Sequence, residues 1–138
     1  MTPRSLAALI AAPALLVLLP LAAAAAETAM PPCDSDAVVG RIANRFNWAE
    51  RNTFHKGVTI DTVDQRRESR LDVAGPSVID KRYCRGQATM SDGSKKRVYY
   101  VIETGGTLTG CGWNVFWCVD GHDPYHVNDG WCRVVRPQ

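Results

Sequence analysis

The stretch WNVFWCVDGHDPYHVNDGWCRVV, residues 113–135, decides how this chain is organised. Its first eight residues alternate with period two, which predicts a strand. One face of this strand holds Trp113, Val115, Trp117 and Val119, and the other holds Asn114, Phe116 and Cys118. Because both faces are largely apolar, we expect the strand to be central in a sheet or covered on both sides.

A polar loop follows this strand and lies between two cysteines, Cys118 and Cys132. Closing a loop of this length stabilises the folded state by about 3 kcal/mol in the chain-entropy model. Asp123-Pro124 and Asn128-Asp129-Gly130 supply the turns that bring its ends together. We therefore expect Cys118 to pair with Cys132.

The same loop carries side chains that could bind a metal ion or act in catalysis, namely Asp120, His122, Asp123, His126 and Asp129. Imidazole and carboxylate groups together can bind zinc or another divalent ion. However, Pro124 lies between the two histidines and disfavours a helix that would align them. We therefore predict a structural loop without a metal, whose ends are fixed by the disulfide and by the rings of Trp117 and Trp131 buried against the sheet.

The start of the chain has the pattern of a secretory signal peptide over residues 1–26. Arg4 precedes an apolar stretch from Leu6 to Leu21, and small residues follow. Cleavage after Ala24 or Ala26 would leave one domain, residues 27–138, in a periplasmic or secreted protein. An uncleaved N-terminal anchor is the alternative. Loss of Arg4 lowers the formal net charge from +2 to +1, which argues for neither a specific nucleic-acid partner nor a membrane.

One helix is expected near the start of this domain, over residues 35–54. Asp34 or Ser35 can cap it, and Gly57 is a stop signal. Its apolar stripe comprises Val38, Val39, Ile42, Ala43, Phe46 and Ala49, with Trp48 and Phe54 at the edge of the core. Residues 27–32 before it read as a loose leader.

Three further β-rich runs follow the helix, at residues 58–73, 78–90 and 97–103. The Asp92-Gly93 pair marks a hairpin between the last two. One helix followed by four strands is an α+β pattern. We expect one N-terminal helix packed on a curved four-stranded antiparallel sheet, a cystatin-like roll, with a small barrel as the alternative. Such folds host inhibitors, binders and enzymes, so the fold does not determine the function.

All five cysteines follow residue 26, and an exported chain is expected to form disulfides. Two bridges among five cysteines allow fifteen arrangements. A helix lying across the sheet can bring Cys33, before the helix, within bridging distance of Cys84 on the second strand. Cys111, between two glycines, is then left as a spare or dimer-forming thiol. A nucleophilic Cys111 is the alternative.

Four segments resemble a pattern found in small exported bacterial proteins of unknown function. They are RYCRG at 82–86, SDG at 91–93, VYYVIE at 98–103 and GWNVFWCVDGHD at 112–123. The resemblance covers roughly the last 60 residues and implies secretion and a disulfide-bonded single domain. It implies no activity, and Cys111 is unusual for the pattern.

Basic residues gather between residues 66 and 97, where nine of them stand against four acidic ones. They are Arg66, Arg67, Arg70, Lys81, Arg82, Arg85, Lys95, Lys96 and Arg97. The simplest interpretation is the solvated face of a sheet. The alternative is a docking surface for an anionic polymer or an acidic protein. Arg82 and Arg85 therefore join Asp120, His122, Asp123 and His126 as candidate binding residues.

These features favour a small exported binding or interaction module without catalytic activity or cofactor, whose partner is an unknown protein or an anionic polymer. The alternative is a small periplasmic hydrolase or metal-dependent enzyme that uses residues 120–129. Glu50, Glu68, Asp92 and Glu103 are acid–base candidates only by being carboxylates. The sequence leaves the oligomeric state open.

Overall fold

The computed structural model describes residues 30–73, 79–105 and 112–137. Within these ranges the elements are α2 (Asp36–Ala49), η1 (Glu50–Phe54), β1 (Ile60–Asp72), β2 (Lys81–Met90), β3 (Lys95–Thr104), β4 (Trp113–Val119) and η2 (Gly130–Cys132). The turn η1 is a π-helical continuation of α2, and η2 is a single 3₁₀ turn. None of the described helices is long and apolar enough to cross a membrane.

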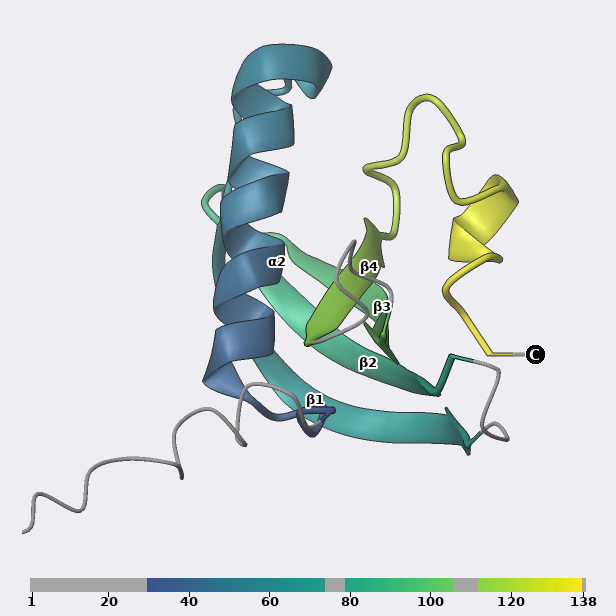
Figure 1. The fold of residues 1–138 in the computed structure, drawn as a ribbon. Coiled ribbons are helices and arrows are strands. Elements are labelled where there is room, and N and C mark those ends of the chain that lie inside the picture. Colours follow the sequence, from purple (N-terminus) through teal and green to yellow (C-terminus); the bar gives the residue numbers. More distant parts are fainter. Residues whose placement is uncertain (1–29, 74–78, 106–111, 138) are drawn as a thin grey trace, which may run out of the picture.

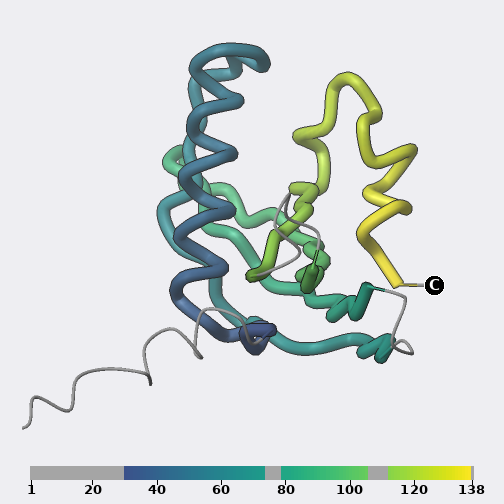
Figure 2. The backbone as a smooth tube through the Cα atoms, viewed as in Figure 1, coloured from purple at the N-terminus to yellow at the C-terminus, as the bar shows by residue number. Residues whose placement is uncertain are grey.

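The four strands form one antiparallel sheet in the order β1-β2-β3-β4. Figure 1 shows α2 on one side of this sheet and the C-terminal segment, residues 120–137, on the other. Figure 2 shows that this segment leaves β4, turns back and descends on its own side of the sheet. The expected α+β class and antiparallel pairing are therefore confirmed.

The main core lies between α2 and the sheet. Val38, Ile42 and Phe46 are fully buried because their spacing places them on one side of the helix. They pack with side chains from all four strands: Ile60, Val63, Cys84, Ala88, Met90, Val98, Tyr100, Ile102, Val115 and Val119. Burial of each large apolar side chain contributes about 1.5–3 kcal/mol.

A smaller core lies on the opposite face, between β3, β4 and the C-terminal segment. Tyr99, Val101, Cys118, Cys132 and Val135 form it. Because successive strand residues point to opposite faces, β3 contributes to both cores. The strand β4 lies at the edge of the sheet, and its outer face is covered only at Cys118, since Phe116 is 48% exposed; the expectation of a strand that is central or covered on both sides is therefore wrong.

The free edge of β4 is closed by side chains. Arg41 donates to the carbonyl of Trp113 at 3.1 Å, Arg45 to that of Val115 at 2.9 Å and Asn128 to that of Trp117 at 3.3 Å. An unpaired strand edge can recruit a strand from another chain, and these hydrogen bonds block that pairing.

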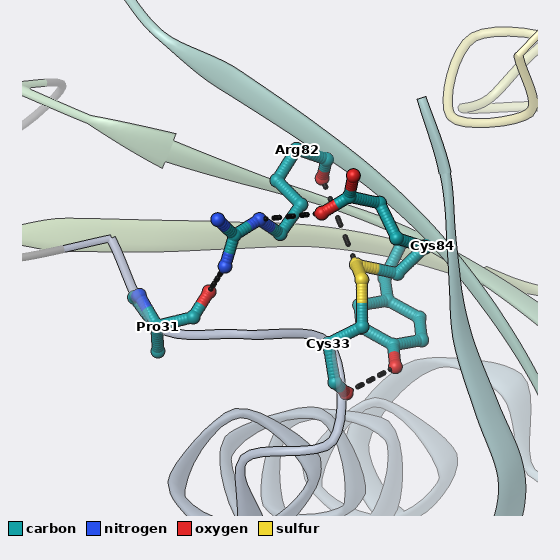
Figure 3. Close-up of a disulfide and its surroundings, with 6 residues drawn as sticks. Pro31, Cys33, Arg82 and Cys84 are labelled. Carbon is teal, nitrogen blue, oxygen red and sulfur yellow. Dashed lines mark hydrogen bonds and ion pairs between the residues drawn. A yellow bond between two sulfur atoms is a disulfide. The ribbon is translucent and has the colours of Figure 1, made fainter. Parts of the chain in front are cut away.

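One disulfide fastens the start of α2 to the sheet. Cys33 pairs with Cys84, with 5.7 Å between their Cα atoms, as the sequence analysis expects. Beside it, the buried hydroxyl of Tyr100 donates to the carbonyl of Cys33 at 2.6 Å. Arg82 donates to the carbonyl of Pro31 at 2.7 Å (Figure 3). Residues 30–33 are thus held on the sheet, which corrects the expectation of a loose leader for this part.

The second disulfide, Cys118–Cys132, ties the C-terminal segment to β4 with a Cα separation of 5.6 Å and is the other expected pair. Trp117 packs against Phe46, with ring centroids 5.7 Å apart. By contrast, Trp131 is 78% exposed, so the expectation that its ring is buried is wrong. Cys111 lies outside the described residues.

The helix differs from expectation at its end. Trp48 is 60% exposed and does not belong to the edge of the core. Phe54 does, since its ring lies 6.4 Å from that of Phe46. The α-helical turns end at Ala49, and His55 then adopts a left-handed conformation.

Glycine at position 86 allows β1 and β2 to approach closely. A Cβ atom there would lie 2.9 Å from Cγ1 of Val63 and 3.1 Å from the carbonyl oxygen of Asp64. The register of β1 shifts at this point, between Asp64 and Arg67, where Gln65 has a positive φ of 51°. These features mark a β-bulge, which re-aims the side chains that follow it.

We predict that Gly86→Ala lowers the free energy of unfolding by about 1–3 kcal/mol, because the added methyl group overpacks this crossing. Gly40→Ala is the matched control, since its Cβ would have no neighbour within 4 Å in an exposed turn of α2. The free energy of unfolding of that variant should rise by about 1 kcal/mol, because alanine has a higher helix propensity than glycine. Urea unfolding compares the two. Equal stabilisation by both substitutions would contradict the packing argument.

Candidate functional site

A groove of about 490 Å³ lies on the part of the outer sheet face that the C-terminal segment leaves open. Its lining residues come from β1, β2 and β3 and from the first residue of the C-terminal segment: Gln65, Arg67, Arg85, Gly86, Gln87, Lys95, Arg97 and Asp120. We call it the basic groove. Three arginines and a lysine face a single carboxylate there.

Strand register brings these cations together. Arg67 lies directly opposite Arg85 on the neighbouring strand, and Gln87 lies opposite Arg97. Arg85 and Gln87 point outward because they alternate with buried neighbours on β2. The bulge at Gln65 then sets the position of Arg67 over the same face.

The four groove cations, Arg67, Arg85, Lys95 and Arg97, are solvent-exposed. Within the part of the chain that the structure describes, none of them forms an ion pair with a carboxylate. Arg97 donates to the hydroxyl of Tyr99 at 3.3 Å, which raises its pKa. With four cations and the single carboxylate of Asp120 among its described lining residues, the groove therefore presents a net positive charge to solvent.

Most other basic residues of this region already have partners. The ion pairs are Arg66–Asp36, Arg70–Asp72, Lys81–Glu103 and Arg82–Glu68, with nitrogen–oxygen distances of 2.9–3.0 Å. Arg70 also stacks on the ring of Tyr83. The two candidate arginines are thus separated: Arg82 anchors the start of α2, whereas Arg85 lines the basic groove.

The aspartates of the 120–129 loop divide between two roles. Asp123 accepts from the backbone N–H groups of Val127 at 2.9 Å and Asn128 at 2.8 Å, so its carboxylate holds a turn. Asp129 accepts from its neighbour Gly130 and pairs with a C-terminal arginine. Asp120 instead lies at the rim of the basic groove.

The two histidines of the loop lie in different surroundings. The ring of His122 packs on Phe46 with a centroid distance of 5.7 Å, and its Nδ1 is buried without a partner. Burial lowers its pKa, and the charges of Lys56 and Lys96 lower it further. His126 is exposed. Among residues 30–73, 79–105 and 112–137, no three His, Cys, Asp or Glu side chains gather as a metal site would require.

A second cavity of about 350 Å³ lies beside the basic groove. It is lined by Val119, Asp120, Gly121, Asp123, Pro124, His126, Asp129, Gly130, Trp131 and Cys132. We call it the indole pocket because it contains the exposed Trp131. Asp120 belongs to both cavities, so the two are adjacent.

Glu50 has a structural role that its sequence position did not reveal. Its side chain is buried, and Oε2 accepts from the backbone N–H groups of Lys56 at 2.7 Å and Gly57 at 3.3 Å. It therefore holds the turn that follows η1. Lys56 in turn donates to the carbonyl of Gly121 at 3.3 Å and links this turn to the loop.

Three groove residues, Arg67, Lys95 and Arg97, appear in the sequence only as members of a basic run. The period-two alternation along β3 could have placed two of them on the outer face, since Lys95 and Arg97 alternate with residues that point toward α2. No such signal exists for Arg67, because the bulge before it breaks the alternation along β1.

Comparison with known proteins finds no matching family model, no matching curated protein and no matching solved structure.

The half-buried ring of His122 should make the free energy of unfolding depend on pH. Its folded pKa lies below the unfolded value near 6.5, so its contribution is fully present above that value and falls as the pH drops toward the folded pKa. Urea unfolding measures this: between about pH 7.5 and about pH 5, the free energy of unfolding should fall more for the wild type than for His122→Gln. The exposed His126→Gln should behave as the wild type. Identical losses in all three proteins would contradict this.

Proposed function

We propose that this protein is an exported binding module without catalytic activity, and that its basic groove holds an anionic polymer. One observation carries the proposal: four cations, Arg67, Arg85, Lys95 and Arg97, converge on one groove from three strands, and none has an ion-pair partner in residues 30–73, 79–105 and 112–137. Because the lining of the groove spans three strands, its cations can contact successive charges of an extended ligand.

The electrostatic repulsion between the groove cations also argues for a bound anion. Like charges directly opposite each other on neighbouring strands are destabilising, and Arg67 faces Arg85 in this way. An anion bound between them would offset the repulsion. Guanidinium groups are well suited to this role, because their planar forks bind carboxylate, phosphate or sulfate oxygens in pairs.

The composition of the groove favours binding over catalysis. Among the residues that the structure describes, no histidine or cysteine lines it, and Asp120 is its one carboxylate. Gln65 and Gln87 add amide groups, which can donate hydrogen bonds to anionic oxygens and accept them from hydroxyl groups.

Export belongs to the same proposal: a signal peptide over residues 1–26 and a mature domain over residues 27–138, in the periplasm or outside the cell. The two disulfides support it, because such bonds persist in oxidising compartments. We extend the proposal to a cystatin-like roll and to kinship with the small exported bacterial proteins that residues 82–123 resemble.

We predict that the purified oxidised protein binds long-chain polyphosphate and polygalacturonate, and that affinity falls as salt is raised from about 20 to about 500 mM. The double variant Arg85→Ala/Arg97→Ala should bind about 5- to 30-fold more weakly, since each exposed ion pair contributes about 0.5–1 kcal/mol. Fluorescence anisotropy with labelled polymers measures this.

The control for this experiment is Arg51→Ala/Arg136→Ala, which removes the same charge from exposed positions that line neither cavity. It should bind within about twofold of the wild type after allowance for the lower net charge. Equal weakening by both double variants would mean that net charge, and not the groove, attracts the polymer. Absence of any polyanion binding would overturn the proposed function.

A separate prediction concerns stability in the absence of ligand. Arg85→Gln removes the repulsion between Arg85 and Arg67 and should raise the free energy of unfolding by about 0.5 kcal/mol at low ionic strength. The gain should disappear in about 1 M salt, where exposed charges are screened. Urea unfolding at both salt concentrations measures it. A loss of stability at low salt would show that the two arginines do not oppose each other.

A further inference from the structure

The indole pocket holds an aromatic side chain in solvent at a conformational cost. Trp131 is 78% exposed and has a φ of 61° and a ψ of 36°. Bulky residues rarely adopt this left-handed conformation, because their Cβ atom approaches the backbone closely. Such an outlier persists only where the surrounding structure enforces it.

Positive φ values are concentrated around this cavity. Half of its ten lining residues have them: Gly121, His126, Asp129, Trp131 and Cys132. The Cys118–Cys132 disulfide and the turn held by Asp123 fix the backbone here. The strained conformation therefore belongs to a rigid rim and presents the indole at a defined position.

Polar groups beside the indole remain available to a ligand. Within the described part of the chain, neither the carboxylate of Asp120 nor the imidazole of His126 has a hydrogen-bond or ion-pair partner. An indole ring offers an apolar face, and carboxylate oxygens accept hydrogen bonds from hydroxyl groups. A sugar ring matches both features, since it has an apolar C–H face and a border of hydroxyl donors.

Resting on the proposed function, we propose that the anionic polymer is an acidic polysaccharide. One sugar ring packs on Trp131 in the indole pocket, and Asp120 accepts hydrogen bonds from its hydroxyl groups. The carboxylate or sulfate groups of neighbouring sugars lie in the basic groove against Arg97 and Arg85. The adjacency of the two cavities at Asp120 allows one chain to occupy both.

Other polyanions fit this pair of cavities less well. Polyphosphate has no apolar ring to place on Trp131. A single-stranded nucleic acid has bases that stack on aromatic rings, but its binding sites use several aromatic side chains along a basic channel. Among the described residues that line the indole pocket, Trp131 is the one tryptophan, tyrosine or phenylalanine, so the pocket offers one large stacking surface where such a channel has several.

The test compares Trp131→Gly with the wild type in binding to polygalacturonate, polyphosphate and a single-stranded oligodeoxynucleotide. Glycine accepts the positive φ at position 131, so this variant removes the indole without backbone strain. We expect about tenfold weaker binding of polygalacturonate and binding of polyphosphate within about twofold of the wild type. Trp48→Ala removes an exposed tryptophan from α2 and should change neither.

Each other outcome overturns the inference. If Trp131→Gly binds polygalacturonate as the wild type does, the sugar site is wrong while polyanion binding by the groove stands. If the oligodeoxynucleotide binds more tightly than polygalacturonate and depends on Trp131, the ligand is a nucleic acid. If neither polyphosphate nor polygalacturonate binds the wild type, the inference and the proposed function fail together. Trp131→Phe keeps an aromatic face and should recover part of the polygalacturonate affinity.

Discussion

The structure depends on the two-sided burial of β3. Val98, Tyr100 and Ile102 face α2, while Tyr99 and Val101 face the C-terminal segment. Neither covering layer is large, and each is tied to the sheet by a disulfide at its end. Beside the Cys33–Cys84 disulfide, burial raises the pKa of Tyr100 to about 12. Its hydroxyl therefore stays protonated and donates to the carbonyl of Cys33, before α2. The sheet is thus held between two short segments that would contribute little stability alone.

This arrangement leaves part of the outer face open. The C-terminal segment packs on Tyr99, Val101 and Cys118, with Tyr83 of β2 at the edge of this cluster, and the basic groove lies beside it on the same face. A fold that needed only solubility could place mixed charges on this open part, as it does with Lys81 and Glu103. Instead, every charged side chain of β1, β2 and β3 that lines the basic groove in the described part of the chain is a cation, and Asp120 lies at one border. The open face therefore has a defined chemistry that burial and solubility do not require.

Local patterns were sufficient to predict much of this fold. Helical spacing identified the buried side of α2, and the placement of Cys33 and Cys84 on facing elements favoured their bridge. The exposure of Trp131 could not be predicted, because tryptophan is usually buried and only the backbone conformation of the disulfide-closed loop turns it outward. The position of Arg67 could not be predicted either, since it reaches the groove through a bulge in β1. That bulge lies against Gly86, where the absence of a Cβ atom lets the two strands approach closely.

The candidate site shows why a basic run in a sequence is ambiguous until the strands are paired. Arg82 and Arg85 are three residues apart, so period-two alternation sends them to opposite faces of β2. Arg82 meets Glu68 and a backbone carbonyl, and its charge serves the fold. Arg85 meets another arginine across the strand pair, and its charge is unfavourable to the fold without an anion. Two arginines in one short segment thus differ in their surroundings: the contacts of Arg82 hold the fold, whereas Arg85 has no ion-pair partner among the described residues.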